Sequence, residues 1–189
     1  VKKTKTKYNH KVTVRFETMP GLQGQVDWGF FENYTVTDVN GEEKKLYCFL
    51  MILGYSRMRY IEFVTDMSTQ TLIKCHLNAF DYFGGYPEEI LYDNMKQVVV
   101  KRLLKQKDST LNRTFEDFAG FFNFKPVLCR PYRGQTKGKI ERVVGYVKAN
   151  NAKNRVYDGL DDWNEKSRSW LERTGNHKVK KKKKKRPDS

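Results

Sequence analysis

Three acidic residues lie at positions from which they could bind one metal ion. Asp27 is the single carboxylate in the run Gly24-Gln-Val-Asp-Trp-Gly-Phe-Phe31, Asp93 follows the short expected strand of residues 89–92, and Glu141 lies in a segment with helical periodicity. Burying an ionised carboxylate is costly unless another group pairs with it, and gathered carboxylates repel one another. A divalent cation removes that repulsion, and carboxylate oxygens suit Mg²⁺ or Mn²⁺. The three acids therefore predict a divalent-metal site.

Each acid also has a simpler interpretation. Asp27 could face solvent from its strand, and Asp93 could be an ordinary turn aspartate. Glu141 could form a helix pair with Lys137 or Lys148. Taken singly these readings compete with a metal site, but the order of the three acids and the basic residues around them favour the metal site.

The elements that must position the first two acids are strands. Alternation and β-branched or aromatic residues predict a strand over 25–39, the hairpin turn Asn40-Gly41, a strand over 45–53 and a third strand over 58–64. Three consecutive strands with tight turns make an antiparallel meander. Asp27 is then in the first, central strand. A short strand over 89–92 ends at Asp93.

Helices alternate with the later strands. We expect a helix that Ser68 caps and Gly84-Gly85 ends, a helix over 114–123, a strand over 125–129 and helices over 138–152 and 160–173. The intervening segment 96–112 is a loop or a strand pair. This order implies parallel additions to the meander, and hence a mixed sheet with helices on both faces.

Two of these helices contain residues that need a separate interpretation. On the first helix, one face collects Leu72, Ile73, His76, Leu77, Phe80 and Phe83, so His76 is expected to be a satisfied core histidine. In the helix over 138–152, a buried stripe of valines and Ile140 leaves Glu141 about 100° round, at the edge of the stripe. A central-strand acid, a strand-end acid and a helix-edge acid can converge on one point. Trp28 and Trp163 are expected in the core.

The positive charge is concentrated in a few segments. The formal net charge is +15, with clusters at 1–24, 96–113, 130–155 and 175–189. Such a distribution suits a polyanion laid across one face. Near Glu141, we expect phosphate contacts from Lys137, Lys139, Arg142 and Lys148, and from Arg130 and Arg133 before the helix. A solvated helix face is the alternative, and for Arg142 the two readings are equal.

Three motifs together resemble the catalytic core of retroviral-type integrases and DDE transposases, in particular IstA-type transposases of bacterial insertion sequences. They are Gln25-Val-Asp-Trp-Gly29, Leu91-Tyr-Asp-Asn94 and Lys137-Gly-Lys-Ile-Glu-Arg142. The flanks Arg15-Phe-Glu-Thr-Met-Pro-Gly21 and Cys129-Arg-Pro-Tyr-Arg-Gly-Gln-Thr-Lys-Gly138 are also similar. The resemblance covers roughly residues 14–175. Each motif alone is weak, but the ordered set with its flanks is specific.

The resemblance implies an RNase H-like fold with Asp27, Asp93 and Glu141 as catalytic metal ligands for two Mg²⁺ or Mn²⁺ ions. It implies a polynucleotidyl transferase: water frees a 3′-hydroxyl at the element end, and that hydroxyl attacks target DNA in an in-line phosphoryl transfer. The implied partners are the terminal inverted repeats, target DNA, further copies of the protein in a synaptic complex, and an AAA+ ATPase regulator. The alternatives are an RNase H-like nuclease and an inactive DNA-binding relative.

One departure from the family concerns the spacer of 47 residues between Asp93 and Glu141, which is longer than in compact retroviral integrases. The extra length is assigned to segment 96–112, as a DNA-contacting insertion. Its candidate contacts are Lys96, Lys101, Arg102 and Lys105, with Lys96 as an ordinary loop lysine in the alternative reading. The lysine run 180–185 matches nothing expected in the family.

The expected organisation is a basic arm over 1–20, a catalytic core over 21–155, a helix over 156–174 on or beside the core, and a basic tail over 175–189. Three separated cysteines without a pair motif argue against a zinc site and suggest reduced thiols. The sequence contains no run of ~18 apolar residues, so no membrane-spanning helix is predicted. The resemblance further implies a bacterial cytoplasmic, nucleoid-associated protein without a membrane partner. Because the sequence starts at Val1 without an initiator Met or a signal peptide, we expect an excerpt of a longer chain.

Overall fold

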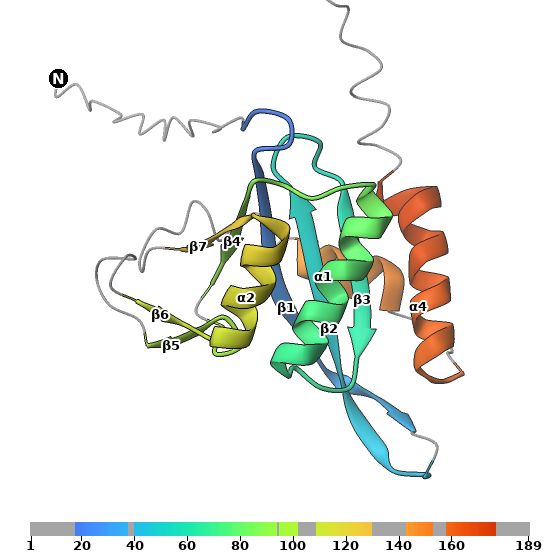
Figure 1. Ribbon diagram of the computed structural model, residues 1–189. Coiled ribbons are helices and arrows are strands. Elements are labelled where there is room, and N and C mark those ends of the chain that lie inside the picture. The colour runs from blue at the N-terminus through green and yellow to red at the C-terminus, as the bar shows by residue number, and fades with distance from the viewer. Residues whose placement is uncertain are drawn as a thin grey trace, which may run out of the picture.

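The computed structural model describes residues 18–37, 40–93, 95–101, 109–129, 143–152 and 158–176. Within these ranges the chain forms a five-stranded sheet in the order β3-β2-β1-β4-β7 and a separate strand pair, β5-β6 (Figure 1). The strands of the large sheet are β1 (Gln23–Thr37), β2 (Glu43–Leu53), β3 (Arg59–Val64), β4 (Glu89–Tyr92) and β7 (Lys125–Leu128). The first three are antiparallel neighbours. Strand β4 pairs in parallel with β1, and β7 pairs in parallel with β4. The mixed sheet is confirmed, with β1 at its centre.

The β1–β2 hairpin projects beyond the other strands (Figure 1). Gly41 in its turn has φ +81°, a left-handed conformation that glycine adopts without strain. Both strands begin two residues earlier than predicted. β1 begins at Gln23 because Gln23–Val26 pair with β4, and β2 begins at Glu43 because pairing resumes beyond a register shift in β1.

Helix α1 (Thr69–Phe83) begins and ends at the predicted caps. Ser68 Oγ accepts from Thr71 N at 3.1 Å, and Gly84 ends the helix in the left-handed conformation. Leu77 was predicted to lie on the apolar face of this helix, and that prediction was wrong. Its side chain is 43% exposed, because it lies about 100° round the helix from buried His76.

The segment between β4 and the next helix is a strand pair, which is one of the two predicted alternatives. Strands β5 (Val99–Lys101) and β6 (Thr110–Leu111) are antiparallel. Helix α2 (Arg113–Phe122) follows, with Asn112 Oδ1 accepting from Phe115 N at 3.3 Å. The pair is held at its base, because Asn112 N donates to Val98 O and Gln97 Nε2 donates to Met67 O.

Helices cover both faces of the sheet, as predicted. Helices α1 and α2 lie on the face turned toward the viewer in Figure 1 and enclose one core layer. Residues 143–152 are helical and end in the π-helical turn η2 (Lys148–Ala152). They pack with α4 (Gly159–Trp170) and η3 (Leu171–Gly175), and the three segments form a second core layer against the sheet. Trp28 lies in the first layer and Trp163 in the second, which confirms both as core residues.

Two asparagine side chains cover the outer edge of β3. Asn164 Oδ1 accepts from Phe63 N (2.7 Å) and Asn164 Nδ2 donates to Phe63 O (2.9 Å). Asn176 makes the same pair of bonds with Arg59, both at 2.9 Å. Each amide thus forms the two bonds that a neighbouring strand would form, so the C-terminal helical segment satisfies an edge that could otherwise pair with another chain.

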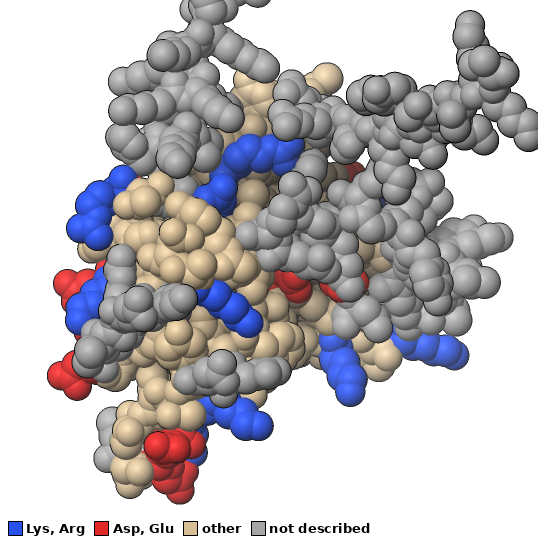
Figure 2. Space-filling model, turned by 180° about the vertical axis from the view of Figure 1, so that it is seen from behind, with Lys and Arg blue, Asp and Glu red and all other residues tan. Residues whose placement is uncertain are grey.

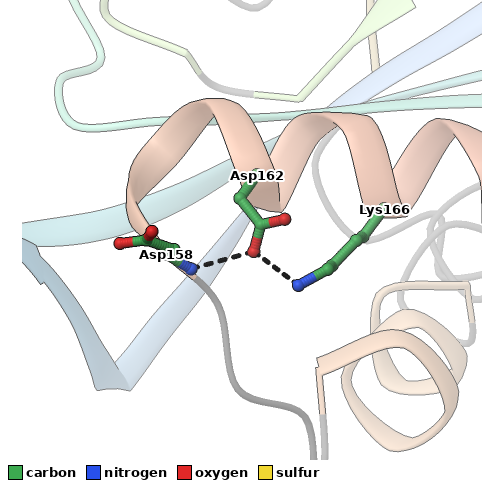
Figure 3. Close-up of polar contacts among 3 residues, drawn as sticks. All are labelled: Asp158, Asp162 and Lys166. Carbon is green, nitrogen blue, oxygen red and sulfur yellow. Dashed lines mark hydrogen bonds and ion pairs between the residues drawn. The ribbon is translucent and has the colours of Figure 1, made fainter.

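Helix α4 is held at its first turn by Asp162. Its Oδ2 accepts from Asp158 N at 2.8 Å and from Lys166 Nζ at 2.7 Å (Figure 3). The hydrogen bond from Lys166, followed by that from the Asp158 amide, lowers the pKa of Asp162. An acidic side chain near a helix N-terminus also has a favourable interaction with the helix dipole. No helix within the described ranges is long and apolar enough to cross a membrane.

Candidate active site

Asp27 lies in the central strand and points to the second core layer. It stands opposite Leu50 in the antiparallel pair, and directly opposed residues share a face of the sheet. Leu50 is buried in the layer formed with residues 143–152 and α4. Asp27 is half-buried, and its Oδ1 accepts from Trp28 N at 2.9 Å.

Asp93 follows directly on β4. The parallel register ends with the pair Val26 and Tyr92, so Asp27 and Asp93 each come one residue after the last paired position. Tyr92 faces the first core layer, which is the face opposite that of Asp27. The backbone turns at once, since Met95 N donates to Asp93 O at 2.7 Å. The two predicted aspartates thus lie one residue past the same end of the β1–β4 ladder.

The helical residues 143–152 cross β1 close to Asp27, at Gly29. A Cβ atom at Gly29 would lie 3.2 Å from Val144 Cγ1 and 3.3 Å from a ring carbon of Phe31. A larger residue would therefore require these side chains to give by a few tenths of an ångström. The sequence interpretation missed the role of Gly29, although a glycine inside a strand pattern is a known signal of close backbone approach.

The third predicted acid, Glu141, lies outside the described residues. Val143 and Val147, which belong to the predicted buried stripe, are buried as expected. In the part of the chain that the structure describes, no three His, Cys, Asp or Glu side chains are grouped to hold a metal ion. Of the three predicted ligands, Asp27 and Asp93 are among the described residues, and their metal-binding role stays a prediction.

Three of the predicted DNA contacts are described, and all three are exposed. Lys96 follows Asp93 by three residues, and Lys101 ends β5. Lys148 Nζ lies 5.3 Å from the centre of the Phe31 ring, a cation–π contact on the side of the sheet to which Asp27 points. On the molecular face opposite that of Figure 1, Lys and Arg side chains occur at several separate places (Figure 2). The other predicted contacts lie outside the described residues: Arg102, Lys105, Arg130, Arg133, Lys137, Lys139 and Arg142.

His76 is a core residue, as predicted, and it is bonded at both ring nitrogens. Nδ1 lies 2.8 Å from Leu72 O, and Nε2 lies 2.8 Å from the Tyr92 hydroxyl. Its side chain is fully buried, and burial lowers the pKa of His76 from 6.5 to about 4. The sequence interpretation did not connect His76 with Tyr92, because the two are 16 residues apart on different elements.

Residues 18–134 match the integrase core domain family, and this range includes both aspartates. The chain belongs to the integrase core domain family. It is 40% identical over 164 residues to an IS21-like insertion-sequence transposase of Bacteroides fragilis, covering 86% of this chain and 31% of the relative. It is 35% identical over 162 residues to the IS21 transposase of Pseudomonas aeruginosa, covering 85% and 40%. The chain thus spans less than half of either relative, and the predicted family resemblance is confirmed.

Solved integrases share the fold of this integrase core domain. The catalytic core domain of HTLV-2 integrase in complex with magnesium (trimeric form) aligns with a TM-score of 0.52 at 18% identity, covering 80% of this chain and 84% of that one. A chain of the simian T-cell lymphotropic virus intasome in complex with a PP2A regulatory subunit aligns with a TM-score of 0.54 at 16% identity, covering 78% and 47%. The predicted RNase H-like fold is therefore confirmed.

Proposed function

We propose that this chain is the catalytic core of a DNA transposase that cleaves the 3′ ends of a mobile element and joins them to target DNA by in-line phosphoryl transfer. The observation that carries the proposal is the placement of Asp27 and Asp93. Asp27 lies in β1 and Asp93 comes directly after β4, and each stands one residue past the last pair of the β1–β4 ladder, at the end of β4. In α/β sheets the carboxyl ends of the strands are the usual place for a functional site.

Glu141 is the proposed third carboxylate. It stands two residues before Val143 in the sequence, a short covalent tether. Val143 is buried in the second core layer, and the next residue, Val144, lies over Gly29, two residues from Asp27. This tether supports Glu141 as a member of the same site.

The carboxylates fit a divalent metal. Asp27 and Asp93 supply carboxylate oxygens, which are hard ligands, at the end of β4. We assign Asp27, Asp93 and Glu141 as ligands of Mg²⁺ or Mn²⁺, two ions in all. Bound metal would activate the attacking oxygen and stabilise the leaving oxygen of the phosphodiester. The magnesium complex of the HTLV-2 integrase core, which has the same fold, supports this assignment.

The basic residues serve the DNA in this proposal. Exposed Lys96 and Lys101 lie on the segment that follows Asp93, from where they can bind phosphates of the element end or the target. The arginines and lysines between residues 130 and 142 are proposed as further phosphate contacts. Further copies of the protein in a synaptic complex and an AAA+ ATPase are the proposed partners, and the bacterial nucleoid is the proposed place of action.

Neutral substitutions of the acids test the proposal in the full-length protein. Asp27→Asn, Asp93→Asn and Glu141→Gln should each abolish joining of a cleaved end to target DNA and leave DNA binding nearly intact, because each removes a charge from the metal site but no phosphate contact. Asp117→Asn, at an exposed acid on α2, is the matched control and should join normally.

The assay also separates the alternatives. A nuclease would cut DNA without joining a 3′-hydroxyl to a new strand, and an inactive relative would bind without cutting. Full joining activity in any one of the three acid variants would contradict the assigned site.

A further inference from the structure

The bonds of His76 fix which group donates to which. A carbonyl oxygen can only accept, so His76 Nδ1 carries the hydrogen that it shares with Leu72 O at 2.8 Å. The ring is neutral near pH 7, because burial lowers the pKa of His76 to about 4. His76 Nε2 is then an acceptor, and the Tyr92 hydroxyl donates to it at 2.8 Å. The result is a directed chain from Tyr92 through His76 to the backbone of α1.

This polar pair is enclosed by aromatic rings. Five phenylalanine rings have centroids between 5.1 and 6.4 Å from that of His76: Phe49, Phe80, Phe115, Phe118 and Phe124. In such surroundings a hydrogen bond is strong, and an acceptor that loses its donor is left unsatisfied. A phenylalanine at position 92 would fill nearly the same space as the tyrosine. Packing alone therefore does not require the hydroxyl.

Tyr92 is the last paired residue before Asp93. Its backbone oxygen accepts from Cys129 N at 2.8 Å, and it is the final partner of both Val26 and Leu128 in the parallel ladders. Beyond it, Asp93 passes directly into the turn closed by Met95. The direction in which Asp93 leaves the sheet thus depends on how residue 92 is held.

We propose that the His76–Tyr92 hydrogen bond is a positioning device for Asp93, pinning the end of β4 to α1 from the opposite face of the sheet. This inference rests on the proposed function, since it assigns the pair to the geometry of the metal-binding carboxylates. Neither residue would touch DNA or metal. Both act through the strand end that carries Asp93.

The test compares joining with stability in the full-length protein. Tyr92→Phe should lower the joining rate per folded molecule about ten- to a hundred-fold, the effect of a small misplacement of a catalytic group, without changing DNA affinity. Ile61→Val, in the other core layer, is the control, because it lowers the melting temperature without touching the strand end. It should join at the wild-type rate.

Two further variants separate positioning from packing. Tyr92→Phe combined with His76→Leu removes both polar partners, so the melting temperature should recover while joining stays low. His76→Gln keeps an amide that can donate to Leu72 O and accept from Tyr92, so joining should be retained. If Tyr92→Phe alone fails to fold, the double variant carries the same test.

The outcomes are distinct from those for the proposed function. Wild-type joining by folded Tyr92→Phe, or recovery of joining together with stability in the double variant, would overturn the positioning role while leaving the acid variants inactive. Joining by Asp93→Asn would overturn both proposals.

Discussion

Lowering the pH should destabilise this fold through His76. In the folded chain the imidazole is fully buried and accepts from Tyr92, so protonation would break that bond and place a charge among aromatic rings. Burial depresses its pKa from 6.5 to about 4. Between these values the unfolded chain takes up a proton that the folded chain does not. The contribution to stability is therefore complete above about pH 6.5 and is lost as the pH falls toward 4.

The magnitude follows from the two pKa values. Each unit of difference corresponds to about 1.4 kcal/mol, so the full contribution is about 3 kcal/mol. At about pH 5, roughly 2 kcal/mol of it should already be lost. That is a large share of the stability of an ordinary domain, which is about 5–15 kcal/mol.

Urea unfolding of the wild type and of His76→Gln between about pH 7 and pH 5 measures the contribution of His76 to the free energy of unfolding. The amide does not titrate, and the carboxylates that gain protons in the same range are common to both proteins, so their effects cancel in the difference. The free energy of unfolding of the wild type should fall by about 2 kcal/mol relative to the variant. A difference that stays constant with pH would refute the reasoning, since it would mean that His76 titrates alike in the folded and unfolded chains.

Two further predictions concern the sheet edge and the DNA surface. Asn164→Ala removes both hydrogen bonds to Phe63 and should lower the free energy of unfolding, measured in urea, by about 1–3 kcal/mol. Unchanged stability would show that water replaces the amide. Replacing Lys96 and Lys101 by alanine should make the salt dependence of DNA affinity shallower by about one to two units of slope, whereas Lys125→Ala, at the opposite end of the sheet, should leave it unchanged. Equal slopes for all variants would exclude the two lysines as phosphate contacts.

The sequence by itself determined the elements whose signals are local. Helix α1 begins after Ser68 and ends before Gly84 because the capping bonds lie within a few residues of each end. The Asn40-Gly41 turn, the strand before Asp93 and the alternation of helices with later strands were likewise readable, and with them the central place of Asp27. Local backbone preference and hydrophobic period are enough for such features.

Only the tertiary structure decided the contacts between segments distant in the chain. The two asparagines that cover β3 lie about a hundred residues beyond it, and Tyr92 meets His76 across two elements. The extension of β1 back to Gln23 depends on its pairing with β4. These contacts depend on which surfaces the fold places together, and no spacing within one segment encodes that. The placement of Asp27 and Asp93 belongs to both levels: the sequence placed Asp27 in its strand and Asp93 at the end of another, and the parallel register made those two strands neighbours.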